Sequence, residues 1–202
     1  MLKNIFREIK TALMLVIAFT ILIGFGYTGA ITFVAQTVFP HKSNGSIIMQ
    51  DGKAQGSRLM GQYFSSPKYF WGRPSAIKTS PYDSLNSSGS NLGPINPKLL
   101  KAVNDRISVL EKADSTNKSK IPVELVTSSA SGLDPDISPL AAYYQVHRVA
   151  KARNLTDDQV IKLLTKYIKK RQFSFLGEDR VNVLQLNLAL DSLKNEKLKA
   201  KK

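Results

Sequence analysis

The longest uncharged stretch of the chain lies near its start, over residues 11–40, and contains no Asp, Glu, Lys, Arg or His. A helix of about 20 apolar residues crosses a bilayer core of roughly 30 Å, so this stretch is long enough to span a membrane. The pattern therefore predicts one transmembrane helix over 11–40. A short N-terminus, residues 1–10, would precede it, and one soluble domain, residues 41–202, would follow it.

The rest of the chain alternates between periodic and irregular patterns, which predicts a mixed α+β domain. An Asp-Gly pair at 51–52 between two short runs predicts a hairpin over 46–60, and residues 123–127 are expected to form a short strand. Residues 61–82 form an aromatic, Pro-rich segment without period. Helices are expected after N-caps at Asn96, Ser138, Thr156 and Asn182. The third would run to about residue 170, and a strand just before the last remains an alternative.

The charges beside the span predict its orientation. The first ten residues contain the basic residues Lys3, Arg7 and Lys10 and only one acidic residue, Glu8. Positive residues beside a first span usually stay in the cytoplasm, whereas long domains translocate largely regardless of charge. We therefore expect a cytoplasmic N-terminus and an extracytoplasmic domain. A cleaved signal peptide is the alternative, but its apolar core of about 7–15 residues would be much shorter.

Composition narrows the function classes. The chain has no cysteine, which excludes disulfides, thiol catalysis and cysteine metal sites. Its formal net charge is +14, with a basic tail over 193–202 that is expected to be solvated or to lie near anionic lipid headgroups. No nucleic-acid-binding signature is present, so the expected surroundings are the lipid bilayer and other proteins.

Motifs of independent enzymes are also missing. The chain has no Walker-A loop, dinucleotide fingerprint, nucleophile elbow or zinc-protease helix. The Asp-Lys-Thr signature of P-type ATPases is absent as well. We expect no catalytic residues, no metal site and no cofactor of its own. The competing class is a membrane-anchored enzyme or an unrelated binding module on an anchor.

Several residue groups are candidates for binding. Small residues four apart in the span, such as Gly24 with Thr28 and Gly26 with Ala30, allow another helix to approach closely. The aromatic segment is either core beneath a long loop or a binding face. The Ser/Gly/Asn-rich loop over 87–93 is either an ordinary loop or a backbone cradle for an anion.

Two charged groups have alternative roles as well. Arg73 can stack on Trp71 or pair with a carboxylate. Asp134 and Asp136 stand just before a helix, where they can close the loop and cap the helix or capture a cation.

The order and spacing of many short blocks resemble the C subunit of the Kdp potassium-importing P-type ATPase over nearly the whole chain. The blocks are 56–57, 61–62 with Phe64, 69–70, 72–76 (Gly-Arg-Pro-Ser-Ala), 82–83, 89–94 (Gly-Ser-Asn-Leu-Gly-Pro), 96–97, 126–127, 131–135 (Ser-Gly-Leu-Asp-Pro), 137–138, Gln145, 148–150, 177–178 and 180–191. The resemblance implies a bacterial or archaeal inner-membrane complex. Its partners would be a channel-like A subunit, an ATP-hydrolysing B subunit and a small F subunit.

The resemblance also implies a role and site residues. The C subunit of that family is described as a catalytic chaperone that raises the ATP affinity of the B subunit. A serine-glycine loop and a glutamine have been proposed to bind nucleotide, and here they correspond to Ser88, Gly89, Ser90, Asn91 and Gln145. Ser88 stands where the family commonly has glycine, and Asp136 where it commonly has histidine. Partner contacts are expected at Gly24, Gly26, Ala30, Tyr69, Trp71, Arg73, Asp134, Asp136 and Arg148.

The predicted orientation conflicts with direct use of ATP, because ATP is cytoplasmic and the domain is placed outside. The preferred expectation is an accessory, non-catalytic subunit of a potassium import complex, with ATP bound only through the complex. The alternative is an outer-face module that docks over the potassium entrance, or gates it, without a nucleotide role. The basic net charge favours docking over the steering of cations.

Overall fold

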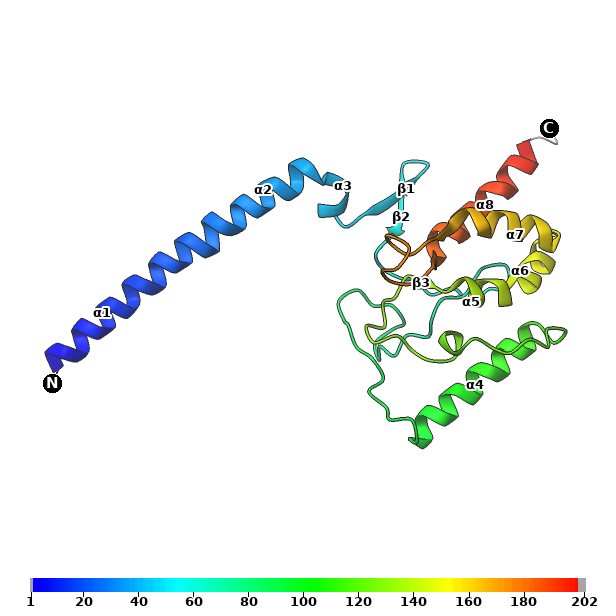
Figure 1. Cartoon of the computed structure of the whole chain (residues 1–202), viewed down its shortest axis with the longest axis horizontal. Coiled ribbons are helices and arrows are strands. Elements are labelled where there is room, and N and C mark those ends of the chain that lie inside the picture. Colours follow the sequence, from blue (N-terminus) through cyan, green and yellow to red (C-terminus); the bar gives the residue numbers. More distant parts are fainter. Residues whose placement is uncertain (1, 200–202) are drawn as a thin grey trace. The chain divides into compact units, whose positions relative to one another are not determined.

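A computed structural model describes residues 2–199 of the chain and the side chains of residues 3–193. The chain divides into two compact units, Met1–Ile47 and Ile48–Lys202. The first unit is helical almost throughout (Figure 1). Its elements are α1 (Leu2–Phe19), the π-helical segment η1 (Thr20–Tyr27), α2 (Thr28–Val38) and α3 (Pro40–Ser43).

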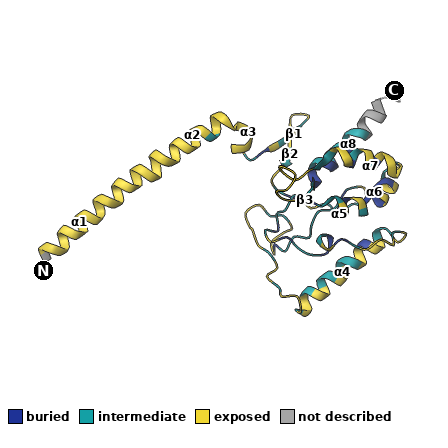
Figure 2. Ribbon diagram, viewed as in Figure 1, coloured by how far each residue is buried: buried dark blue, intermediate teal, exposed yellow. Residues whose placement is uncertain are grey.

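The helix of the first unit has the length and composition of a membrane span. The helix runs over Lys3–Val38, and an 18-residue window within it has a mean hydropathy of 2.1 and no burial. Its side chains are exposed along almost the whole length (Figure 2). It is the one such helix among the residues that the structure describes, which agrees with the predicted single span. The helix already begins at Leu2, so most of residues 1–10 are helical as well.

The span ends as the sequence predicts and contains one irregular stretch. Phe39 leaves helical backbone at φ −129°, and Pro40 occupies the first turn of the short helix α3. Within η1 the helix widens to π geometry. This geometry is rare in proteins, and where it occurs it is often at a functional site. Gly24 and Gly26 lie in this stretch, and the Thr28 hydroxyl donates to the Gly24 carbonyl.

The second unit mixes helices with short strands, so the predicted α+β class is confirmed. Its elements are β1 (Ile47–Gln50), β2 (Lys53–Ser57), α4 (Pro97–Ala113), the 3₁₀ turn η2 (Val123–Leu125), β3 (Asp136–Ile137), α5 (Pro139–Tyr144), α6 (Val146–Arg153), α7 (Asp157–Tyr167), β4 (Ile168–Lys169), β5 (Arg180–Asn182) and α8 (Val183–Lys199). The basic tail that the sequence predicts begins at residue 193, and its side chains lie outside the described ones except for the first.

Local sequence signals place the turns and helix starts correctly. Asp51 and Gly52 join β1 to β2 with positive φ at both residues, as a tight hairpin turn requires. The side chains of Asn96 and Ser138 accept hydrogen bonds from backbone amides in the first turns of α4 and α5. Thr156 starts α7 with a complete capping box.

A small antiparallel sheet lies at the centre of the domain core. β5 pairs with β3 on one side and with β4 on the other, and Val181 is opposite both Ile137 and Ile168. Val181 is fully buried, and helices α5 to α8 supply most of the core around it (Figure 2). The strand predicted as an alternative before the last helix is therefore present, and the Asn182 side chain accepts from Gln185 N in the first turn of α8.

One predicted strand is wrong, and one predicted helix ends earlier than expected. The strand over 123–127 is a 3₁₀ turn followed by Thr127, whose amide and hydroxyl both donate to the Val123 carbonyl. Such side-chain bonding to nearby backbone favours a turn over a strand. The third helix ends at Tyr167 and not near residue 170, because Ile168 and Lys169 pair with β5.

Candidate docking site around the aromatic segment

The aromatic segment is partly core and partly exposed. Phe70 is fully buried, Trp71 is half-buried and Tyr63 is exposed. Residues 67–73 have no helix or strand, so their backbone groups must find partners elsewhere. The two interpretations offered by the sequence therefore hold for different residues of the same segment.

Two buried side-chain amides supply those partners. Asn187 of α8 accepts from Phe70 N at 2.8 Å and donates to Phe70 O at 3.0 Å. Gln145, between α5 and α6, accepts from Trp71 N at 2.8 Å and donates to Trp71 O at 3.1 Å. Both amides are only 1% exposed. Each side chain thus bonds both backbone groups of one residue, as a neighbouring strand would, and the pair fixes the segment to the helical core.

Arg148 completes this support from α6. Its guanidinium donates to Pro67 O at 2.7 Å, to Tyr69 O at 3.0 Å and to Gln145 Oε1 at 2.6 Å. It also lies over the Trp71 ring, 3.9 Å from the centroid. Burial lowers the pKa of Arg148 to about 10, so the group is still charged at neutral pH.

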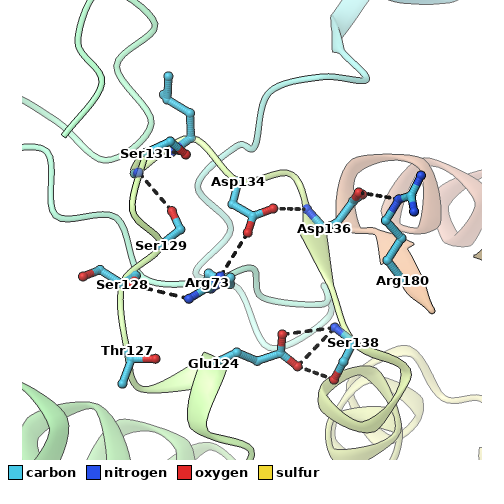
Figure 3. Close-up of polar contacts among 12 residues, drawn as sticks. Arg73, Glu124, Thr127, Ser128, Ser129, Ser131, Asp134, Asp136, Ser138 and Arg180 are labelled. Atoms are coloured by element: carbon cyan, nitrogen blue, oxygen red, sulfur yellow. Dashed lines mark hydrogen bonds and ion pairs between the residues drawn. The ribbon is translucent and has the colours of Figure 1, made fainter. Parts of the chain in front are cut away.

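Asp134 and Asp136 each pair with an arginine, and a hydrogen bond joins the two ion pairs (Figure 3). Arg73 Nη1 lies 3.1 Å from Asp134 Oδ2, and Asp134 Oδ1 accepts from Asp136 N. Asp136 in turn pairs with Arg180 Nε at 3.2 Å. Arg73 therefore pairs with a carboxylate, while Arg148 is the arginine that stacks on Trp71.

The aspartates close the loop before α5 and do not cap the helix themselves. The cap is Ser138, whose amide and hydroxyl donate to Glu124 (Figure 3). Among the described residues, no group of three or more His, Cys, Asp or Glu side chains could hold a metal ion. Each aspartate already has an arginine partner, so nothing in this arrangement favours the cation-capture alternative.

A cleft lies beside the aromatic segment, bounded also by α4 and η2. Its volume is about 330 Å³. Its lining includes two arginines and, among the described side chains, no carboxylate. The lining residues are Gln62, Tyr63, Phe64, Ser65, Trp71, Gly72, Arg73, Pro74, Ser75, Pro81, Tyr82, Arg106, Val109, Leu110 and Leu125. The cleft is therefore apolar and aromatic with positive charge.

The proposed nucleotide loop and Gln145 have different surroundings. Ser88 N donates to Ser131 O at 2.9 Å, and a Cβ at Gly89 would lie 2.9 Å from Ala130 O. Because it has no side chain, Gly89 allows the two loops to pack closely against each other. Ser88, Ser90 and Asn91 are exposed, whereas Gln145 is buried with partners in the aromatic segment and the adjoining helices. Nucleotide binding by this set stays a prediction.

The other predicted partner contacts are also untested. Gly24, Gly26 and Ala30 are exposed on the helix of the first unit, where a partner helix can reach them. Tyr69 is half-buried, and its hydroxyl donates to Asp191.

Three residues of the site were not predicted as site residues from the sequence. Asn187 is a polar residue among the leucines of α8, and an amide at a buried helix position is a signal that could have identified it. Arg106 lies beside the apolar face of α4, and Tyr82 ends the Pro-rich segment. Neither of these two has a local signal, because their roles depend on which loops pack together.

Tyr82 gives the site a measurable pH dependence. Its hydroxyl donates to Arg73 O, and burial raises the pKa of Tyr82 from 10.0 to about 12. The folded state holds this proton longer than the unfolded state, so the stabilising effect is complete below pH 10 and is lost as pH rises toward 12. As pH rises toward 12, we expect the free energy of unfolding of the wild type to fall by about 2 kcal/mol more than that of Tyr82→Phe.

Denaturant unfolding of the wild type and of Tyr82→Phe at pH 9 and pH 12 checks this expectation. The pKa values of Tyr69 and Tyr144 are also raised, but both tyrosines remain in the variant, so their effects cancel in the comparison. An equal loss of stability in wild type and variant would contradict the assignment to Tyr82.

Comparison with known proteins agrees with the resemblance seen in the sequence. A family model described as KdpC, the K+-transporting ATPase c chain, matches residues 9–192. A potassium-transporting ATPase KdpC subunit of Herpetosiphon aurantiacus is 53% identical and aligns over 92% of this chain and 96% of its own. One from Methylococcus capsulatus is 51% identical over 93% and 99% of the two chains. One from Paraburkholderia xenovorans is 51% identical over 96% and 99%.

Proposed function

The chain belongs to the KdpC family of potassium-transporting ATPase subunits, and on this premise we propose that it is an accessory, non-catalytic subunit that docks on its partners from the outer face of the membrane. The helix over Lys3–Val38 would anchor it with a cytoplasmic N-terminus. The expected partners are the channel-like A subunit, the ATP-hydrolysing B subunit and the small F subunit. The domain would sit near the potassium entrance of the A subunit.

The observation that carries this proposal is that both the oxygen and the nitrogen of the Gln145 side-chain amide already have hydrogen-bond partners within the domain. Its oxygen accepts from Trp71 N and Arg148 Nη2, and its nitrogen donates to Trp71 O and Ala141 O. Binding of a nucleotide by this side chain would break bonds that hold the aromatic segment in place, and a buried polar group without a partner is costly. The arrangement supports a rigid scaffold for the cleft, which suits docking better than nucleotide binding.

The orientation of the domain is the decisive test. Because the chain has no cysteine, Ser115→Cys and Asn4→Cys each introduce a single thiol at an exposed residue, one in the loop after α4 and one in the first helix. In sealed right-side-out vesicles, a membrane-impermeant maleimide is expected to label Cys at 115 at once. A thiol at position 4 should react only after the membrane is permeabilised.

The reverse labelling pattern would overturn the proposal. It would place the domain in the cytoplasm, where the exposed loop at Ser88–Asn91 could meet ATP, and the chaperone role implied by the resemblance would then be favoured. Labelling of both positions in intact vesicles would show leakage, which a cytoplasmic marker enzyme controls for.

A further inference from the structure

We propose that the cleft beside Trp71 binds an extended peptide segment of a partner subunit through a carboxylate side chain of that segment. This rests on the proposed function, since the partner is a subunit of the same complex. The cleft is defined by its lining on the aromatic segment, α4 and η2. Three properties of it carry the inference: its shape, its charge and its rigidity.

The shape and lining suit a peptide. Pockets of about 300–1,000 Å³ with mostly apolar walls are typical ligand sites, and the volume here is about 330 Å³. Grooves lined by aromatic residues receive extended peptides in several recognition modules. Tyr63 is 66% exposed and Val109 is 55% exposed at this cleft, so large apolar side chains stand open to solvent. A peptide backbone with small or apolar side chains would cover them.

The charge specifies an anion. Arg106 forms no ion pair with any described carboxylate, and its one hydrogen bond runs from Nη1 to Val126 O at 2.7 Å. Burial lowers the pKa of Arg106, because the guanidinium is partly removed from water. Arg73 is paired with Asp134, yet its buried Nε has no partner in the described part of the chain. Asp or Glu on an incoming segment would complete the pairing at Arg106.

The rigidity of the wall makes binding specific. Trp71 is fixed by Gln145 through its backbone and by Arg148 across its ring. Pre-organised sites lose less entropy on binding. A free anion would leave the aromatic walls exposed, and a polyphosphate would meet only one unpaired arginine. The cleft therefore fits a single carboxylate on an apolar strand.

The test uses the complete membrane complex with a photo-crosslinking amino acid in place of Tyr63. Irradiation followed by mass spectrometry is expected to identify an extended, extracytoplasmic segment of a partner subunit with an Asp or Glu near the crosslink. Arg106→Gln should lower the crosslink yield and raise the rate at which the subunit leaves the complex, each by about tenfold. Arg106→Lys should retain much of both because it keeps the charge.

Lys112→Gln is the matched control, since it removes an exposed cation from the same helix away from the cleft and should change neither value. Once the partner carboxylate is known, reversing both charges should restore the crosslink. A crosslink to lipid, to nucleotide or to a segment without Asp or Glu would overturn the inference. So would the absence of any crosslink while the subunit still purifies with the complex and Cys at 115 is labelled from outside, and in that case the proposed function would stand.

Discussion

Gln145→Ala is expected to lower the free energy of unfolding of the domain by about 3–5 kcal/mol. The variant leaves the amide and carbonyl of the half-buried Trp71 without these partners, and it removes one acceptor from Arg148. A buried polar group that loses its partner costs about 1–3 kcal/mol, so the losses add to a severe defect. The change would also free the wall of the cleft.

Urea unfolding of the full chain in detergent micelles checks this, with fluorescence of Trp71 as the probe, since it is the one tryptophan of the chain. Gln159→Ala serves as the control because it removes only the capping box of α7, for about 0.5–1 kcal/mol. A Gln145→Ala chain as stable as that control would contradict the structural role.

This expectation changes how a phenotype at Gln145 should be interpreted. Loss of potassium-dependent growth in the variant would follow from fewer folded subunits, since a few kcal/mol is enough to change abundance in cells. Only a loss of function at equal subunit abundance would indicate direct contact with a ligand. Measuring the amount of assembled complex beside growth separates these two causes.

Asn187→Ala is expected to cost about 2–4 kcal/mol, because Phe70 N and O both lose their buried partner. Combined with Gln145→Ala, the loss should be smaller than the sum of the single losses, since neighbouring sites that hold one segment are not independent. Once one amide is gone, the segment is already partly released from the core.

The same urea unfolding measures the cycle. Asn86→Ala is the control, as this exposed asparagine bonds only Thr79 and Asp83 in its own loop and should change stability by less than about 0.5 kcal/mol. Strict additivity of the Gln145 and Asn187 changes would show that the two amides stabilise separate parts of the domain.

The features predicted well from the sequence are those with local causes. The hairpin at Asp51-Gly52 and the caps at Asn96, Ser138 and Thr156 each depend on a few adjacent residues. The apolar span follows from composition alone, and the family from the spacing of many short blocks. Each of these could be predicted without knowing which distant segments meet.

The central sheet and the site depend on distant contacts. β3 and β5 have only two and three residues, and they pair across more than forty positions, so no local pattern specifies them. The sequence pointed to these residues separately, with Gln145 as a candidate for nucleotide binding and Trp71 and Arg148 as candidate partner contacts. That these three lie together, with Asn187 holding the next residue, follows only from packing.

The side-chain amides at Gln145 and Asn187 have a consequence for motion. Irregular segments are usually the mobile parts of a domain, and their amide protons exchange quickly with solvent. At Phe70 and Trp71 the amide protons are held by buried side chains, so their exchange requires these amides to withdraw from the core. The amide protons of these two loop residues should therefore exchange as slowly as those of the central helices. Which parts of the domain are rigid then depends more on its buried hydrogen bonds than on the location of its helices and strands.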